Sequence, residues 1–379
     1  CVSVPALKAP LVSLQPPTTQ HDNGNGQATS WGRLNFSFID PVATMAHLDQ
    51  FQIFQQLGKG AYSTVSLVRR RSTTQYHALK TIPKEKVNTP QQAAHVFAER
   101  AALTTLVDCP HVVTLDDTFK DSTHLYFLLE CIGGGPLHHH LRAASAGRFI
   151  ATTAKFYAIE ISLALEACHT HNIIYRDLKL SNVLVSKSGH LKLTDFGFAK
   201  VVPWGEKTST YCGTPHAMAP EILLQQPHDR CCDWWSFGVL VYEMMMGAPP
   251  TGYRIGKEEQ QEILLGHPNA AFPHDVFGAV DEEKSNTSQG NRGTFLAADF
   301  IRQCWSIDPA TRLGGGQESG AKEIHAHAWM DENIVNDIRA STITPPVPNA
   351  TCFLFEEHPD PTEEASTLTA QEQAMFAGF

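Results

Sequence analysis

Apolar and polar positions divide the chain into a first part with strand-like patterns and a second part with helical ones. Short runs that suggest strands lie at residues 51–57, 65–69, 76–80, 112–119 and 125–131. In the first run both alternating sets contain apolar residues, so the period alone leaves that strand ambiguous. Thr89 and Pro90 suit a helix N-cap and first helical position, which predicts a helix running through Leu103.

After the break at Gly133-Gly134-Gly135-Pro136 the pattern becomes helical. Phe156, Ile159 and Leu163 share one helical face, and the segments 235–245 and 300–304 also favour helices. We therefore expect an α+β fold with two lobes joined by this hinge. The smaller lobe, residues 51–131, is mostly β with one key helix, and the larger lobe, residues 132–330, is mostly α.

The two ends of the chain and one internal segment lack a periodic pattern. Residues 1–50 predict a flexible extension, and residues 331–379 predict an irregular tail. The polar stretch from Asp281 to Thr294 is expected to be a surface insertion. No run of 18 apolar residues occurs, so we expect no transmembrane segment.

Charge and cysteine content limit the classes of function. The formal net charge is −10 and the pI is about 6.0, which argues against a nucleic-acid partner. The nine cysteines are odd in number and include no C-x-x-C pair, so free thiols in a reducing compartment are expected. This favours the cytoplasm, with the nucleus left open as a second location.

A glycine-rich turn stands between the first two predicted strands. It reads Gly58-Lys59-Gly60-Ala61-Tyr62-Ser63, and its glycines allow backbone N–H groups to approach phosphate oxygens. Alone the motif is weak, because many hairpins contain two glycines. Lys80 ends the third strand and can hold phosphates if an acid such as Glu99 fixes it; the alternative is an ordinary surface lysine.

The segment Tyr175-Arg176-Asp177-Leu178-Lys179-Leu180-Ser181-Asn182 is more specific. Asp177 can accept the proton of an incoming hydroxyl, and Lys179 can neutralise a transferring phosphoryl group. Asn182 and the Asp195 of Thr194-Asp195-Phe196-Gly197 can ligate Mg²⁺, which prefers a few protein oxygens together with phosphates. An Asx-rich loop without this function is the alternative.

Ala219-Pro220-Glu221 completes a series of five motifs in a fixed order. The loop before it carries Thr208, Ser209 and Thr210, and Arg176 can pair with a phosphate placed there. Agreement between five motifs makes coincidence improbable.

These motifs resemble those of the eukaryotic protein kinases over residues 51–330. The tyrosine of Tyr175-Arg176-Asp177, the run Asp195–Lys200 and the run Thr210–Pro215 resemble the AGC group, nearest to the cyclic-nucleotide-dependent kinases. The resemblance implies the bilobal kinase fold and transfer of the γ-phosphate of ATP, with Mg²⁺, to serine or threonine. The segments Phe353–Glu357 and Phe376–Phe379 resemble tail segments that cover the nucleotide and dock on the small lobe.

The resemblance also assigns residues. It places in the adenine pocket Leu57, Val65, Ala78, Leu129, Glu130, Ile132, Leu184 and Thr194. It implies that Thr210 is a phosphorylation site whose phosphate is held by His95, Arg176 and Lys200. It further implies that Thr214 bonds near Asp177, that Asp233 anchors the catalytic loop, and that Arg312 pairs with Glu221.

Three positions depart from the family pattern. Pro136 and Ser181 stand where the cAMP-dependent enzyme has glutamates that bind substrate arginines, and Ala217 replaces a tyrosine. Glu243 remains as the one matching acid, so a preference for basic substrates is expected to be weakened. The partners implied are protein substrates with Ser or Thr acceptors, a regulatory subunit and an upstream activating kinase.

Two other functions stay open at this point. One is a pseudokinase that acts as a binding scaffold, for which Ser63 in place of a third glycine is the only mark at the nucleotide site. The other is the catalytic part of a cGMP-dependent kinase, although about 50 residues before the kinase region are few for a cyclic-nucleotide domain.

Overall fold

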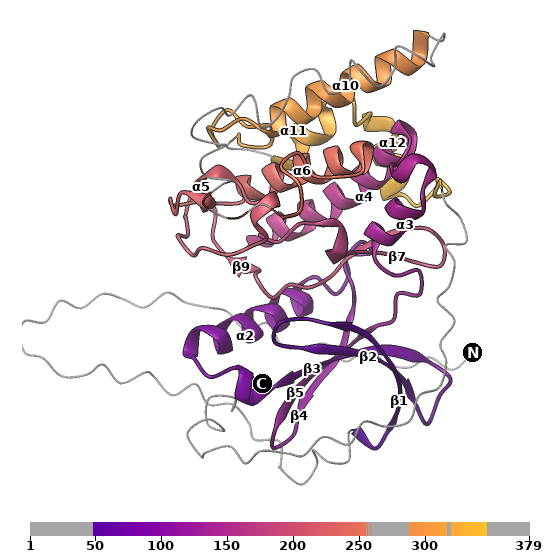
Figure 1. Ribbon diagram of the computed structural model, residues 1–379, viewed down its shortest axis with the longest axis vertical. Helices are drawn as coiled ribbons and strands as arrows, with labels where there is room; N and C mark the ends of the chain where they lie inside the picture. Colours follow the sequence, from indigo (N-terminus) through magenta and orange to yellow (C-terminus); the bar gives the residue numbers. More distant parts are fainter. Residues whose placement is uncertain (1–47, 255, 257, 259–287, 317–319, 347–379) are drawn as a thin grey trace, which may run out of the picture. The chain divides into compact units, whose positions relative to one another are not determined.

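The computed structural model describes residues 48–254, 256, 258, 288–316 and 320–346. Its first part is a five-stranded antiparallel sheet, and a helical region follows along the chain (Figure 1). The sheet has the order β1-β2-β3-β5-β4, built from β1 (Phe51–Lys59), β2 (Thr64–Arg70), β3 (Tyr76–Pro83), β4 (Leu115–Lys120) and β5 (His124–Glu130). The predicted α+β class is confirmed.

The ambiguous pattern of the first strand has a structural cause. Strand β1 pairs with β2, but its register shifts between Ile53 and Gln56 and again between Gln56 and Gly58. Such irregularities reverse the face to which later side chains point, so that Phe51 and Phe54 are both buried although they are three residues apart. The run predicted at 112–119 starts later than expected, because Val112 forms only an isolated bridge to Leu193.

Helix α2 (Pro90–Thr105) lies between β3 and β4 in the chain and begins where the sequence predicts. Thr89 and Gln92 form a capping box: the Thr89 hydroxyl accepts from the Gln92 backbone N–H at 3.2 Å, and the Gln92 side chain accepts from the Thr89 N–H at 3.2 Å. The cap fixes the start of the helix, and so the turn on which Glu99 lies.

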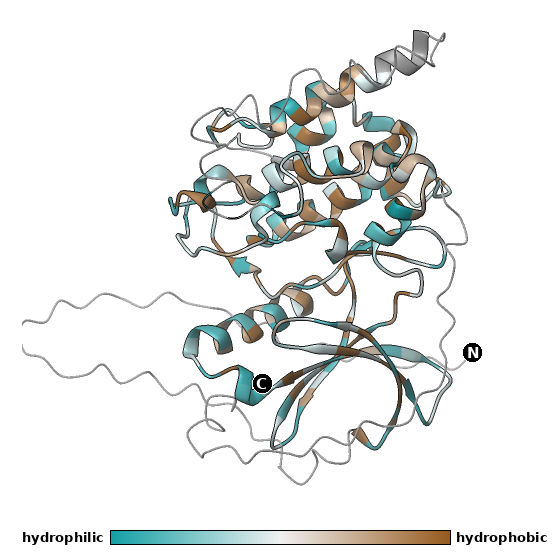
Figure 2. Ribbon diagram, viewed as in Figure 1, coloured by the Kyte–Doolittle hydropathy of each residue, from teal (hydrophilic) through white to brown (hydrophobic). Residues whose placement is uncertain are grey.

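Two long helices form the centre of the helical region. They are α4 (Ala151–Thr170) and α6 (Cys231–Met246), and both are buried along most of their length. Hydrophobic positions run through them, whereas α2 mixes hydrophilic and hydrophobic positions (Figure 2). A helix that is apolar on most sides must be enclosed by others. The surrounding helices are α3 (Leu137–Ala143), α5 (Pro220–Leu223), α10 (Ser288–Cys304), α11 (Gly320–Ala326) and α12 (Glu332–Arg339).

Short strands and turns hold the chain between α4 and α6. The pairs are β6 (Ile173–Ile174) with β9 (Lys200–Val201), and β7 (Val183–Val185) with β8 (Leu191–Leu193). Two 3₁₀ turns also lie in this stretch, η4 (Leu180–Asn182) and η5 (Pro215–Ala217). Two others lie earlier in the chain, η2 (Lys84–Lys86) and η3 (Ser145–Gly147). Because the segment between β6 and β7 is tied at both ends, its polar side chains have fixed positions.

One helix of the second half is longer than the sequence indicated. Helix α10 includes the segment 300–304, which the pattern favours as helical, but it begins at Ser288, within the polar stretch expected to be a surface insertion. The buried residues Ala297, Phe300, Ile301 and Cys304 have helical spacing, but the turns before them are polar and gave no periodic signal. The extension 1–47, the insertion up to residue 287 and the tail segments Phe353–Glu357 and Phe376–Phe379 lie outside the described residues. Within the described part, no helix combines the length and apolar character needed to span a bilayer.

Candidate active site

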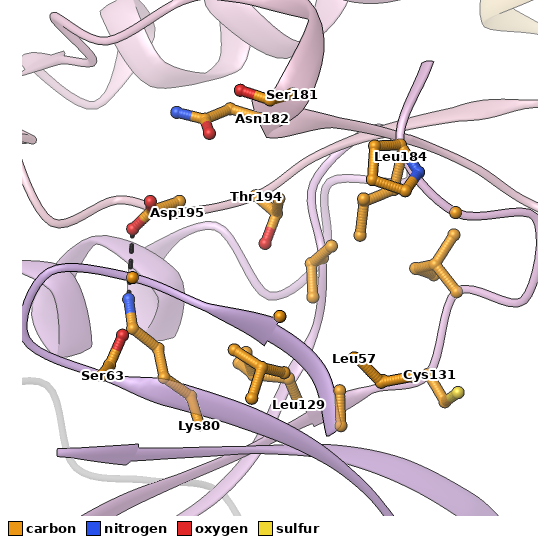
Figure 3. Close-up of a pocket in the computed structure, with 18 of the residues that line it drawn as sticks. Leu57, Ser63, Lys80, Leu129, Cys131, Ser181, Asn182, Leu184, Thr194 and Asp195 are labelled. Carbon is orange, nitrogen blue, oxygen red and sulfur yellow. Dashed lines mark hydrogen bonds and ion pairs between the residues drawn. The ribbon is translucent and has the colours of Figure 1, made fainter. Parts of the chain in front are cut away.

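A pocket of about 520 Å³ is enclosed by the sheet, α2, the hinge after β5 and the β7–β8 region (Figure 3). Most of the predicted nucleotide-binding residues line it: Leu57, Gly58, Lys59, Gly60, Ser63, Val65, Ala78, Lys80, Glu99, Leu129, Glu130, Ile132, Leu184 and Thr194. Ala61 and Tyr62 do not line it and are exposed at the tip between β1 and β2. The sequence therefore located the pocket, but not the direction in which the glycine-rich tip projects.

Several lining residues were not predicted from the sequence. Leu103, Val113, Cys131 and His139 also face the pocket. A signal existed for Leu103, because it follows Glu99 by four residues on the same helix and so shares its face. Val113 precedes β4 and Cys131 follows β5, outside regular pairing, so strand alternation could not indicate where they point.

The polar end of the pocket contains a lysine between two carboxylates. The Lys80 Nζ donates to Glu99 Oε1 at 2.6 Å. It also donates to Asp195 Oδ1 at 3.1 Å (Figure 3). Burial alone would lower the pKa of Lys80, but the two carboxylates outweigh it and raise that pKa. The Lys80 charge in turn lowers the pKa of Asp195. Lys80 is thus a fixed cation rather than the surface lysine of the alternative interpretation.

Asp195 and Asn182 have oxygens that fit a divalent cation. Asp195 uses one oxygen for Lys80, and its side chain is half exposed. The Asn182 amide nitrogen donates to the carbonyl and carboxylate oxygens of Asp177, which leaves the amide oxygen for another ligand. Among the described residues no cluster of three or more His, Cys, Asp or Glu side chains forms a metal cage. Two oxygen ligands completed by phosphate oxygens suit Mg²⁺.

Asp195 also has an unusual backbone conformation, with φ of 59°, and Arg176 has φ of 66°. Residues other than glycine adopt this left-handed region rarely and at an energetic cost. Both outliers lie next to chemistry-bearing residues, where such strain tends to concentrate.

The carboxylate of Asp177 is held by three side-chain donors. The Thr214 hydroxyl donates to Oδ1 at 2.6 Å, while Lys179 and Asn182 donate to Oδ2 at 2.8 and 2.9 Å. Lys179 also donates to the Thr214 hydroxyl at 2.8 Å, so the contacts close into a ring. This network fixes the orientation of a buried acid and places a lysine beside it. The predicted contact between Thr214 and Asp177 is therefore present.

Two buried carboxylates, those of Asp233 and Glu221, form charge-assisted hydrogen bonds with separate parts of the chain. Asp233 on α6 accepts from the backbone N–H of Tyr175 at 2.9 Å and of Arg176 at 2.7 Å. Arg312 forms a bidentate pair with Glu221 at 2.7 and 2.9 Å. Breaking a buried pair of this kind typically costs about 3–5 kcal/mol, because one charge is left without a partner. Both contacts were expected from the sequence.

Arg176, Lys200 and His95 gather at the segment after Asp195, and Lys200 reaches Thr210. Lys200 Nζ donates to Thr208 Oγ1 at 2.7 Å and to Thr210 Oγ1 at 3.4 Å. The Arg176 Nε donates to the Phe198 carbonyl at 2.8 Å, and its buried Nη1 has no hydrogen-bond partner among the described residues. Burial, and then the charges of Arg176 and Lys200, lower the pKa of His95. The closer contact to Thr208 was not foreseen.

The residues predicted to select the substrate do not all lie together. Pro136 and Ser181 line the pocket. Glu243 lies on α6, is 3% exposed and does not line the pocket. Its carboxylate accepts from the Tyr253 hydroxyl at 2.6 Å.

Comparison with known proteins agrees with this geometry. A family model described as the protein kinase domain matches residues 51–330. The chain belongs to the protein kinase family. That match spans the sheet, the pocket and the helical region, and ATP is the phosphoryl donor of this family.

Curated relatives narrow the group. The chain is 38% identical over 299 residues to the cAMP-dependent protein kinase type 3 of Saccharomyces cerevisiae, which covers 79% of this chain and 69% of that protein. It is 36% identical to the cAMP-dependent protein kinase catalytic subunit 3 of Drosophila melanogaster (79% of this chain, 47% of that protein). It is 35% identical to the human serine/threonine-protein kinase Sgk2 (83% and 81%). The kinase is thus a serine/threonine kinase of the AGC group, and it spans about half the length of some of its relatives.

Proposed function

We propose that this kinase transfers the γ-phosphoryl group of ATP to serine or threonine side chains, with Asp177 as the base. The supporting observation is the ring formed by Asp177, Lys179 and Thr214. The acceptor hydroxyl attacks the γ-phosphorus as the bond to the β-phosphate oxygen breaks and ADP leaves. The hydroxyl proton passes to the Asp177 carboxylate, and Lys179 neutralises charge on the transferring group.

The nucleotide lies in the pocket with its phosphates at the polar end. Lys80, positioned by Glu99, would bind phosphate oxygens there, and backbone N–H groups of the glycine-rich turn would supply further donors. Asn182 and Asp195 would hold Mg²⁺, which would supply positive charge to the phosphates. Catalysis would then depend mainly on positioning and electrostatics.

A direct test compares acceptors and one substitution. With radiolabelled ATP and Mg²⁺, peptides containing serine or threonine should be labelled and matched tyrosine peptides should not. Asp177→Asn should lower kcat by about 10²–10⁴-fold while nucleotide binding persists, because only proton acceptance is lost. Asp117→Asn, an exposed acid on β4, is the matched control. Equal turnover in Asp177→Asn and the unmodified chain would instead favour a scaffold whose labelling comes from a contaminant.

Activation is proposed to require phosphate on Thr210, added by an upstream kinase. The support is the group of Arg176, Lys200 and His95, which are positioned to receive an anion. A phosphate adds a charge of about −1.5 to −2 and can form charge-assisted hydrogen bonds with these residues. The loop would then be fixed relative to the catalytic segment through Arg176, the neighbour of Asp177.

Substrate class, partner and location complete the proposal. A preference for basic residues is proposed for the peptide as a whole, weakened because Pro136 and Ser181 carry no charge, and the cAMP-dependent relatives suggest a regulatory subunit as partner. The seven described cysteines are free thiols, which supports a reducing compartment such as the cytoplasm. Pull-down with a cyclic-nucleotide-binding regulatory subunit, with and without cAMP, tests the partner.

A further inference from the structure

A buried carboxyl group that the proposed chemistry does not use lies near the catalytic segment. Glu243 on α6 is 3% exposed, yet among the residues that the structure describes a single side-chain hydrogen bond reaches it, from Tyr253 Oη at 2.6 Å. Tyr253 itself is 51% exposed. Tyr253 therefore lies between the Glu243 carboxyl group and the solvent, and about half of its own surface remains exposed.

A series of contacts connects this pair to the acid that receives the substrate proton. Thr214 binds Asp177, and the turn η5 that follows it carries His216. The His216 ring packs edge-on against Tyr253, with centroids 5.6 Å apart. Burial and then the charge of Lys179 lower the pKa of His216, while Asp177 acts in the opposite direction. His216 thus connects the Tyr253 surface to the segment on which an acceptor hydroxyl would meet Asp177.

The state of Glu243 argues against an open site for a cation. Burial raises the pKa of Glu243 to about 7, and the Tyr253 hydroxyl and the charge of Arg142 on α3 only partly oppose that effect. A carboxyl group that is partly protonated near neutral pH and already accepts a short hydrogen bond attracts a guanidinium weakly. Because the Tyr253 hydroxyl holds Oε1, a substrate arginine would have to displace Tyr253 to form a bidentate pair with both carboxylate oxygens.

We propose that Tyr253 determines substrate specificity by occupying the Glu243 carboxyl group, so that the peptide residue lying over this surface is uncharged rather than basic. The inference rests on the proposed transfer to serine or threonine, and it identifies the substrate class at this position. On this proposal Tyr253, and not Glu243 alone, determines which peptide side chain is preferred at this position. A peptide with glutamine there binds at least as well as one with arginine.

The test measures peptide binding separately from transfer. Peptides with arginine or glutamine at each position around a fixed serine are titrated by fluorescence anisotropy, in the presence of a non-hydrolysable ATP analogue. In Tyr253→Ala the affinity ratio of arginine to glutamine should rise about tenfold or more at one position, since a charge-assisted hydrogen bond becomes available. Tyr253→Phe keeps the ring and loses only the donor, so a smaller rise is expected. Tyr76→Phe, a partly exposed tyrosine on β3, is the matched control.

A double variant identifies the acid responsible. Adding Glu243→Gln to Tyr253→Ala should return the ratio to that of the unmodified kinase. A gain that persists in the double variant, or ratios unchanged in Tyr253→Phe with a normal melting curve, overturns the inference. Tyr253→Phe decides the matter if Tyr253→Ala does not fold. Radiolabel transfer in parallel samples reports separately on the proposed function, because the binding ratio does not depend on turnover.

Discussion

Two groups of ionisable residues in this kinase differ in whether the folded chain supplies their cations with acidic partners. Lys80 at the end of the pocket meets two carboxylates, at 2.6 and 3.1 Å. Arg176, Lys200 and His95 near Thr210 form no ion pair within the described part of the chain, and meet hydroxyl groups and a carbonyl instead. In the first group the fold supplies the cation with acidic partners, and the second keeps an excess of positive charge.

The difference has visible effects on the ionisable groups. The carboxylates raise the pKa of Lys80, whereas burial and the neighbouring cations lower the pKa of His95. Unpaired cations in a partly buried place attract an anion more strongly than cations in water, because the local dielectric constant is lower. Lys80, which is already paired, can thus act without further modification of the chain. The unpaired cations near Thr210 favour regulation by an added phosphate.

The largest expected effect comes from removing one member of the contact between Lys80 and its two carboxylates. Lys80→Met or Asp195→Asn should reduce kcat/KM by at least about 10²-fold, since each removes charge stabilisation from the transition state. Single-turnover transfer with radiolabelled ATP measures this, and circular dichroism confirms folding. Lys187→Met, an exposed lysine after β7, should change nothing. Asp195→Asn with normal turnover at saturating Mg-ATP would show that the pocket ions are assigned incorrectly.

The next largest effect is expected from removing the phosphate site next to Arg176 and Lys200. Thr210→Ala should lower kcat/KM by about 10–100-fold relative to the phosphorylated kinase, the range expected when charge-assisted hydrogen bonds are lost. Fragment mass spectra should locate the phosphate on Thr210 in active enzyme. Thr208→Ala serves as the comparison, because Thr208 is buried and bonds Lys200 more closely. Phosphate found on Thr208 alone would contradict the assignment.

A smaller effect involves a third region, the core of the large lobe. His325 on α11 bonds the Ser162 hydroxyl at 2.9 Å, and burial, with the charge of Arg339, lowers its pKa from 6.5 to about 4. The unfolded chain then binds this proton at a higher pH than the folded one. The free energy of unfolding should fall as pH drops from 6.5 toward 4, by about 1–2 kcal/mol at pH 5 from this group.

Urea unfolding at pH 7 and pH 5 measures that dependence. His325→Gln should lose less stability between the two pH values than the unmodified kinase, whatever its stability at pH 7. The exposed His171→Gln is the control and should retain the full dependence. Identical pH slopes in His325→Gln and the unmodified chain would rule out His325 as a source of acid sensitivity.

The smallest expected effect is a change in one pKa value. If phosphate on Thr210 neutralises the excess positive charge, the pKa of His95 should rise from its lowered position. Histidine NMR titration of the phosphorylated and unphosphorylated kinase measures the change, with His171 as an internal reference. A pKa of His95 that does not respond to phosphorylation would place the phosphate away from His95 and the cations Arg176 and Lys200.

Much of the site could be predicted because its residues lie in short motifs. The segment from Tyr175 to Asn182 contains the proposed base Asp177, Lys179 and the proposed metal ligand Asn182 within eight residues, and the structure brings these three side chains together. The start of α2 was predicted for a similar reason, since its capping box is local. The start of α10 was missed because its first turns are polar, and the register of β1 was hidden by irregular pairing with β2.

The sequence by itself determined the kinase motifs, their order, the two-lobed α+β architecture and most of the residues that line the pocket. The tertiary structure decided which donors reach Asp177, that Thr208 lies closer to Lys200 than Thr210 does, and that Tyr253 covers Glu243. The physical reason is the separation along the chain between the residues that interact. Caps and motifs depend on neighbours a few residues away, whereas hydrogen bonds between separate elements depend on how the whole core packs, which no local pattern records.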